Sequence, residues 1–168
     1  VIDTGIEHGT ITALVNKKSF EITTLRKDIS TDGRHAKVEY TKSWNEDAKR
    51  RDLTINSIYA SIDGQIFDPY NGIEDLYNGK IKFIGLAEER IQEDYLRILR
   101  YFRFFTQYSQ VDHDNNIIRY IKKNINGLNQ ISKERIFDEI KKILSSKNFY
   151  KLFTNQTSKE IILNIFPQ

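Results

Sequence analysis

The segment EDYLRILRYFRF, residues 93–104, carries carboxylates and guanidinium groups at spacings that suit recognition of a nucleobase. On a continuous helix, Glu93, Arg97 and Arg100 share one face, and Asp94 lies about 60° round from Arg97. A carboxylate accepts a hydrogen bond from an exocyclic amine, and a guanidinium donates to a ring nitrogen or a carbonyl. An Asp94–Arg97 pair would therefore accept cytosine or adenine. It would reject uracil and guanine, because each buried group left unpaired costs about 1–3 kcal/mol.

The same segment has a simpler interpretation as an amphipathic helix whose charged face forms salt bridges. Ile98, Leu99, Phe102 and Phe105 cover the other side and would pack into a core. From the residues alone, both interpretations stay open.

A second polar segment, AKRRDLTINSIYA at residues 48–60, scans as a helix but sorts its side chains poorly. Its apolar residues do not form the single stripe that a surface helix needs. The polar groups therefore stand where core contacts are expected. Asp52 and Asn56 either serve a ligand or bridge the local backbone.

Before residue 85 the sequence predicts strands mixed with short helices. Residues 10–26 are rich in β-branched side chains and predict two strands joined at 16–18. Residues 27–43 are polar and predict a loop. A helix is expected from Trp44 to about Tyr59, with Ser43 or Asn45 as its N-cap. Further on we expect a hairpin around Asp63-Gly64, a helical turn, and a short strand at 81–84.

From residue 86 onward the periodicity is helical throughout. The predicted fold class is α+β, with a mixed or antiparallel sheet and helices in residues 1–85 and an all-α part in residues 86–168. The predicted helices span 86–91, 92–108, 115–124, 132–145, 147–153 and 158–165.

Composition narrows the classes of protein that the chain can belong to. The 168 residues include no Cys, which rules out disulfides and Cys-based zinc sites and fits a reducing, cytoplasmic location. There is no apolar run long enough to span a bilayer, so we expect no membrane partner. The net charge of +3 is compatible with a nucleic-acid partner.

Five segments in order resemble one family, the class II CCA-adding tRNA nucleotidyltransferases and bacterial poly(A) polymerases of the DNA polymerase beta superfamily. The resemblance covers about residues 5–144. Each segment alone is modest, but five in the same order are specific. They are EHGTITALVNKKSFEITTLR (7–26), RRDLTINSIY (50–59), DPYNGIEDLYNGKIKFIG (68–85), EDYLRILRYFRF (93–104) and ISKERIFDEIKKIL (131–144).

The resemblance implies a partial nucleotidyltransferase head followed by a helical neck and body. It implies addition of C and A from CTP and ATP to tRNA 3′ ends, or adenylation of other RNA 3′ ends. A guanidinium binds phosphate bidentately, and Asp52 and Asn56 would hold a ribose hydroxyl. The nucleotide-binding residues that it implies are Arg50, Arg51, Asp52, Thr54 and Asn56, with Glu93, Asp94, Arg97 and Arg100 in the base-selecting segment.

The resemblance also assigns a metal ligand. Glu21 lies on a predicted strand and matches the third carboxylate that binds catalytic Mg²⁺ in this superfamily. Alternatively, it is an exposed strand residue. His8 is expected to tie a loop to the first strand. Arg34 or His35 is a weaker candidate for phosphate contact.

The sequence departs from the family at its most characteristic feature. The Gly-rich loop and the Asp-x-Asp strand that supply two metal carboxylates are not found, so we expect a truncated chain that is inactive alone. The Asp112-His113-Asp114 triplet lacks a Gly-rich approach, and Asp114 or Asn115 is expected to be an ordinary N-cap. The alternatives are half of a split enzyme completed by a separate polypeptide, a non-catalytic nucleotide- or RNA-binding module, and a remnant without function.

Overall fold

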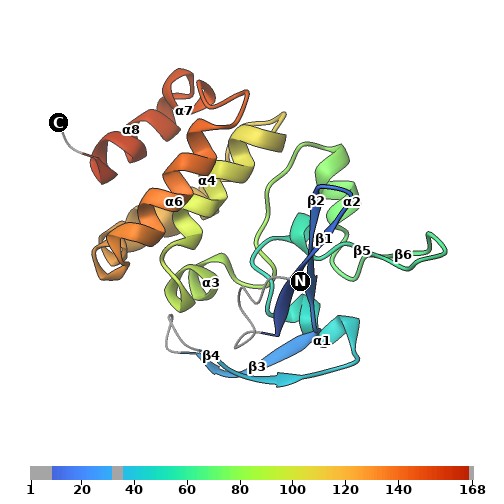
Figure 1. Ribbon diagram of the computed structural model, residues 1–168. Helices are drawn as coiled ribbons and strands as arrows, with labels where there is room; N and C mark the ends of the chain where they lie inside the picture. The colour runs from blue at the N-terminus through green and yellow to red at the C-terminus, as the bar shows by residue number, and fades with distance from the viewer. Residues whose placement is uncertain (1–8, 32–35, 167–168) are drawn as a thin grey trace. The chain divides into compact units, whose positions relative to one another are not determined.

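The computed structural model describes residues 9–31 and 36–166, whose elements are labelled in Figure 1. They divide into two compact units, one ending at Arg50 and the other beginning at Arg51. The residues His8, Arg34 and His35 lie outside the described part. These two units are defined by the contacts within the structure. The predicted boundary near residue 85 divides the head domain of the family from its neck and body, and it stays a prediction.

The first unit begins with an antiparallel hairpin of β1 (Thr10–Val15) and β2 (Lys18–Thr23). The two turn residues, Asn16 and Lys17, both have positive φ angles of 50° and 63°. Such a turn matches the right-handed twist of the paired strands. The predicted pair of strands joined at 16–18 is confirmed.

A second hairpin of β3 (Arg26–Thr31) and β4 (Ala36–Tyr40) follows, with a shift of register between Asp28 and Ser30. The predicted loop over 27–43 is therefore wrong for both strands. These strands are rich in polar and charged residues and so lack the alternation of apolar and polar side chains from which a strand is predicted. An exposed strand is stabilised by cross-strand pairs rather than by local propensity. One such pair joins Lys27 and Glu39 at 3.2 Å.

Helix α1 (Trp44–Lys49) starts as predicted, since the Ser43 side chain accepts a hydrogen bond from the Glu46 amide. It ends ten residues earlier than predicted, and a short 3₁₀ turn, η2 (Thr54–Asn56), follows. The reason is a tertiary pairing with residues 82–84. Thr54 N donates to the Lys82 carbonyl and Ile84 N donates to the Asp52 carbonyl, at 3.0 and 2.9 Å. Backbone groups used in this way are lost to helix formation.

The second unit continues with two small elements before its helices. The predicted hairpin around Asp63-Gly64 is confirmed as β5 (Tyr59–Ala60) paired with β6 (Ile66–Phe67). The helical turn is α2 (Gly72–Tyr77). The predicted strand at 81–84 forms only an isolated bridge, between Leu53 and Phe83.

The remainder of the second unit is helical, as predicted. The helix expected over 92–108 is interrupted, because Asp94 is extended between α3 and α4. The helix expected over 147–153 begins only at Lys151. The helices are α3 (Ala87–Glu93), α4 (Arg97–Tyr108), α5 (Asn115–Asn124), η3 (Ile125–Gln130), α6 (Lys133–Leu144), α7 (Lys151–Thr154) and α8 (Gln156–Ile165).

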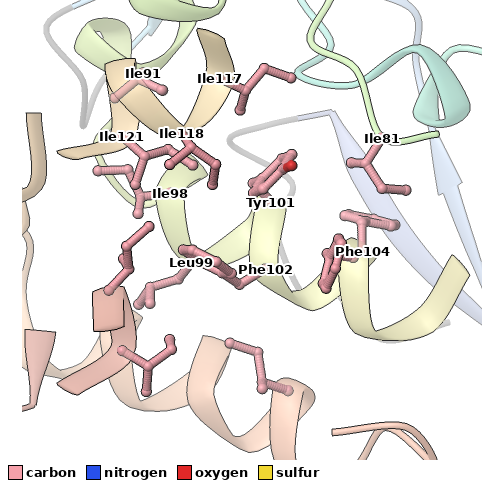
Figure 2. Close-up of a cluster of buried hydrophobic side chains, with 14 of the residues drawn as sticks. Ile81, Ile91, Ile98, Leu99, Tyr101, Phe102, Phe104, Ile117, Ile118 and Ile121 are labelled. Atoms are coloured by element: carbon pink, nitrogen blue, oxygen red, sulfur yellow. The ribbon is translucent and has the colours of Figure 1, made fainter. Parts of the chain in front are cut away.

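Helix α4 is the central element of the core, and Figure 2 shows its side chains packed against those of α5. Ile98, Leu99 and Phe102 are fully buried and Phe105 nearly so, which confirms the predicted apolar side. Each such side chain contributes about 1.5–3 kcal/mol through burial. Because most sides of α4 are packed against other residues, the helix cannot rotate about its axis. Its polar residues, which include Arg97 and Arg100, are therefore held in place.

A half-buried histidine ties α4 to α8. His113 Nδ1 lies 2.9 Å from the Tyr101 hydroxyl, and Nε2 lies 2.7 Å from Ser158 Oγ. Its ring stacks on Phe105 with 3.7 Å between centroids. Burial lowers the pKa of His113 to about 4, although the nearby charge of Asp112 opposes this. The imidazole is therefore neutral near pH 7.

One further property concerns helix length and hydropathy. In residues 9–31 and 36–166, no helix combines the length and the apolar character needed to cross a membrane.

Candidate nucleobase-recognition site

Asp94 occupies the break between α3 and α4, with an extended φ of −155°. Its Oδ1 accepts a 3.1 Å hydrogen bond from Leu96 N, and its carbonyl accepts from Arg97 N at 2.9 Å. Asp94 and Arg97 are thus neighbours across a helix start rather than on one face of a continuous helix. The bond to Leu96 N fixes the direction of the carboxylate.

The other oxygen of Asp94 is held by a residue from α6. Arg135 donates to Asp94 Oδ2 at 2.7 Å, and the two side chains are 37% and 20% exposed. Arg135 lies in the first turn of α6, whose N-cap is Ser132. Sequence reasoning did not assign Arg135 a role, although it lies in the fifth segment that resembles the family.

Arg97 is positioned by two groups on α3. It donates to Glu93 Oε2 at 2.6 Å and to the Arg90 carbonyl at 2.9 Å. Glu93 also accepts from Arg90 Nη1, at 2.9 Å on Oε1 and 2.7 Å on Oε2. The Arg90 guanidinium in turn donates to the Arg51 carbonyl. Arg90 is a second residue of this site that the sequence did not indicate, because its position in the chain is typical of an ordinary surface helix.

Asp52 joins the second polar segment, residues 48–60, to α4. Its Oδ2 accepts from Arg100 Nε at 2.6 Å, and its Oδ1 accepts from Asn56 Nδ2 at 2.8 Å. Burial by itself raises the pKa of Asp52, but the hydrogen bond and charge of Arg100 and the amide of Asn56 outweigh it and bring the pKa to about 2. For Arg100, burial lowers the pKa and the bond to Asp52 raises it, with a net increase.

The other residues of the RRDLTIN segment are placed differently. Thr54 is buried and donates to Asp75 at 2.9 Å, so its side chain faces α2. The guanidinium of Arg51 lies 5.9 Å from the centre of the Tyr59 ring. Arg50 belongs to the first unit, where it donates to the buried Asp47 at 2.9 and 2.6 Å.

Glu21, the predicted metal ligand, lies on β2 in the first unit, where it is exposed and pairs in register with Thr12. Within the described residues, no three His, Cys, Asp or Glu side chains group closely enough to hold a metal ion. The described residues therefore do not build the expected Mg²⁺ site by themselves.

The Asp112-His113-Asp114 triplet behaves as the sequence predicted. Asp114 is the N-cap of α5 and accepts from Asn116 N and Ile117 N. Asp112 accepts from Asn155 Nδ2 at 3.0 Å. Both carboxylates serve local structure.

The ionic cluster of the second unit brings four guanidinium groups together with three carboxylates. Its carboxylates accept hydrogen bonds and its guanidinium groups donate them, and the edge of a base requires both close together. The cluster has one more positive than negative charge, which suits a phosphate. The cluster consists of Arg90, Arg97, Arg100 and Arg135 with Asp52, Glu93 and Asp94.

Comparisons with known proteins agree with this architecture. A family model described as the poly(A) polymerase head domain matches residues 1–82. A second, described as the "probable RNA and SrmB-binding site of polymerase A", matches residues 114–168.

Curated relatives match most of this chain. It is 57% identical over 142 residues to the human mitochondrial CCA tRNA nucleotidyltransferase 1. This match covers 83% of this chain and 33% of the human protein. It is 43% identical over 150 residues to the CCA-adding enzyme of Ligilactobacillus salivarius. This match covers 88% of this chain and 37% of that enzyme. The chain thus spans about a third of the length of the relatives it matches.

Among solved structures, the Bacillus stearothermophilus CCA-adding enzyme in complex with CTP is similar, with a TM-score of 0.75 and 35% identity. The match covers 88% of this chain and 35% of the enzyme. Two family models match successive parts of the chain, a curated relative is 57% identical to it, and a solved structure of the family shares its fold. The chain therefore belongs to the family of CCA-adding tRNA nucleotidyltransferases and poly(A) polymerases.

Proposed function

We propose that this chain selects cytosine and adenine nucleotides for addition to tRNA 3′ ends, as part of a tRNA nucleotidyltransferase. The observation that carries the proposal is the fixed placement of Asp94 and Arg97, each held by another ionic side chain. Arg135 holds Asp94, and Glu93 holds Arg97. Groups held in this way can discriminate, because they cannot rotate to suit the wrong base.

The hydrogen-bonding capacity of Asp94 is not exhausted by its partners. A carboxylate offers about four lone-pair directions on its two oxygens. Leu96 N and Arg135 take one on each oxygen. Asp94 can still accept from the exocyclic amine of cytosine or adenine while Arg97 donates to the neighbouring ring acceptor.

Contacts to the rest of the nucleotide are assigned to the RRDLTIN segment. We assign phosphate binding to Arg51, and to Arg50 of the first unit, because guanidinium groups match phosphate geometry. Asp52 and Asn56 hold each other, and their remaining acceptors would meet the ribose. Thr54 would act indirectly, through the η2 turn that it stabilises by its bond to Asp75.

Mg²⁺ and the chemical step need more than the described residues. Nucleotidyl transfer uses metal-bound carboxylates to place the 3′-hydroxyl against the α-phosphate. Glu21 is the one candidate ligand that we assign in this chain, so no catalytic step is assigned to it alone. The other carboxylates would come from a longer form of the protein or from a separate polypeptide.

Adenylation of RNA 3′ ends is a second candidate function, favoured by the description of the head-domain model. The names of the curated relatives favour CCA addition with CTP and ATP. A strict adenylating enzyme needs to select only adenine, whereas the Asp94–Arg97 pair suits both bases.

The organisation and location of the chain complete the proposal. We assign residues 1–85 to the nucleotidyltransferase head and residues 86–168 to the base-selecting neck and body. The cytoplasmic location stays a prediction, because the human relative is named as a mitochondrial protein.

Equilibrium dialysis of the purified chain against labelled CTP, ATP, UTP and GTP tests base selection. We expect CTP and ATP to bind at least about tenfold more tightly than UTP and GTP, since one lost hydrogen bond costs on the order of 1.4 kcal/mol. Equal binding of all four would refute the proposal.

Incorporation assays test the chemistry. The chain is incubated with Mg²⁺, labelled CTP or ATP and tRNA lacking its 3′ CCA. We expect no incorporation by the chain alone and incorporation when a polypeptide with the Gly-rich loop and the Asp-x-Asp strand is added. Incorporation by the lone chain would show that Glu21 is not its only metal carboxylate.

A further inference from the structure

Arg90 on α3 donates hydrogen bonds to two segments that lie far apart in the sequence. One terminal nitrogen, Nη2, donates to the Arg51 carbonyl at 2.5 Å. The other, Nη1, donates to both carboxylate oxygens of Glu93, at 2.9 and 2.7 Å. All three residues belong to the second unit. A single guanidinium therefore links the RRDLTIN segment to the start of the base-selecting segment.

The Arg90 side chain is held in a largely dry position. It is only 12% exposed, so water cannot readily replace either partner. The next residue, Ile91, is fully buried in the core that Figure 2 shows, which fixes α3. Burial lowers the pKa of Arg90, but an arginine keeps its charge in proteins. Its planar fork holds two acceptors in fixed directions, which a lysine ammonium does less well.

On one side, Arg90 fixes the start of the RRDLTIN segment. The residues just after Arg51 are already held, because the Asp52 carbonyl accepts from Ile84 N and the Asp52 side chain pairs with Arg100. Arg51 itself precedes these contacts and is the first residue of the second unit. The bond from Arg90 extends the hold to the Arg51 backbone. The position of the phosphate contact that we assign to Arg51 therefore depends on Arg90.

On the other side, Arg90 joins the carboxylate that holds Arg97. Glu93 Oε2 accepts from both guanidinium groups, at 2.7 Å from Arg90 and 2.6 Å from Arg97. Arg97 also donates to the Arg90 backbone carbonyl at 2.9 Å, and this bond does not need the Arg90 side chain. Arg97 thus has two bonds of its own. What the Arg90 side chain adds is a link between this pair and Arg51.

We propose that Arg90 couples phosphate binding to base selection. It is a positioning residue, which sets the place of Arg51 relative to Arg97 and touches neither phosphate nor base. A nucleotide whose phosphates are anchored then presents its base edge to Asp94 and Arg97 in one position. A wrong base cannot shift to find other partners while its phosphates stay bound. The inference rests on the proposed function and adds that the phosphates take part in choosing the base.

The coupling predicts that selectivity depends on the phosphates. A nucleoside has no phosphate anchor, so uridine can shift against the Asp94–Arg97 pair and loses less binding than UTP does. The ratio of CTP to UTP affinity should exceed the ratio of cytidine to uridine affinity by about fivefold, which corresponds to about 1 kcal/mol. Equilibrium dialysis with labelled CTP, and with UTP, cytidine and uridine as competitors up to millimolar concentration, measures both ratios.

The variant R90M tests the link directly, because methionine keeps the aliphatic stem and removes every donor. Its ratio of CTP to UTP affinity should fall about fivefold, whereas its ratio of cytidine to uridine affinity should change by less than about twofold. The second ratio is kept because Arg97 retains its bonds to Glu93 and to the backbone of residue 90. A general loosening of the site would lower both ratios together and would overturn the proposal.

The conservative variant R90K should recover part of the difference between the two ratios, because an ammonium still pairs with Glu93. Thermal unfolding checks that each variant is folded. If R90M does not fold, R90K carries the test, and a difference equal to that of the unmodified chain would overturn the proposal. The matched control R119M removes an exposed guanidinium from α5 of the same unit and should leave both ratios unchanged.

The outcomes separate this inference from the proposed function. Equal binding of CTP and UTP by the unmodified chain would overturn the proposed function, and this inference with it. A preference for CTP that R90M leaves unchanged, or that R119M lowers as much as R90M does, would overturn the role of Arg90 alone.

Discussion

Arg135 on α6 donates a 2.7 Å hydrogen bond to the Asp94 carboxylate at the break between α3 and α4. Asp94 therefore depends on a residue of a distant segment for the direction of its free lone pairs. Since the two side chains are only partly exposed, solvent cannot readily replace the guanidinium. In the base selection that we propose, Arg135 would therefore position Asp94 rather than touch the base.

Replacing Arg135 should relax base selection. In R135Q the Asp94 carboxylate loses its charged partner and can rotate, so the ratio of CTP to UTP affinity should fall about tenfold. The conservative variant R135K should keep part of the preference, because an ammonium still pairs with the carboxylate. Equilibrium dialysis with both nucleotides measures this ratio.

The matched control for Arg135 is Arg119, which lies on α5 and stacks over the Tyr120 ring. R119Q removes the same charge from the same unit and should leave the ratio unchanged. A similar fall in R119Q would mean that net charge, and not the position of Asp94, sets the preference.

Asp52 should add a phase to acid unfolding at very low pH. Its pKa is about 2 in the folded protein and 3.8 in its ordinary state, so its contribution is complete above pH 3.8 and is lost as the pH falls toward 2. The difference corresponds to about 2 kcal/mol. In D52N this phase should disappear, and the variant should be less stable at pH 7 because Arg100 loses its partner.

Urea unfolding at intervals between pH 2 and pH 7 measures the Asp52 phase. The control is D138N, because Asp138 is exposed and its ion pair with Lys141 contributes little. If D52N and the unmodified chain lost stability in parallel below pH 3.8, the buried pair with Arg100 would not be the cause.

His113 should add a separate phase at higher pH. Its pKa falls from an ordinary 6.5 to about 4 in the folded protein, so the unfolded chain binds the proton first. Stability is then complete above pH 6.5 and decreases as the pH falls toward 4. We expect a loss on the order of 2 kcal/mol, since solvent screens part of the effect.

The variant H113Q removes this titration and can keep one of the two hydrogen bonds. The slope of stability against pH between 4 and 6.5 should flatten in H113Q, at the cost of lower stability at pH 7. Replacing His8 and His35 with Gln in both proteins removes their own titration from the comparison. An unchanged slope in H113Q would show that the His113 imidazole is not responsible.

Local patterns in the sequence predicted much of the fold. The β1–β2 hairpin, the turn at Asp63-Gly64, the Ser43 and Asp114 caps and the apolar side of α4 all follow from periodicity, turn residues and capping. These features depend on contacts within a few residues. The α+β class and the family follow from the same order of segments.

The tertiary structure decided the features that depend on distant partners. The residues after Lys49 leave the helix because 52–54 pair with 82–84, and the break at Asp94 puts it opposite Arg135. The strands β3 and β4 form through mutual pairing that their polar residues do not reveal. The sequence by itself thus determined which side chains are available for the proposed base selection. Only the packing of α3, α4 and α6 decided which guanidinium pairs with which carboxylate, because such pairs join groups far apart in the chain.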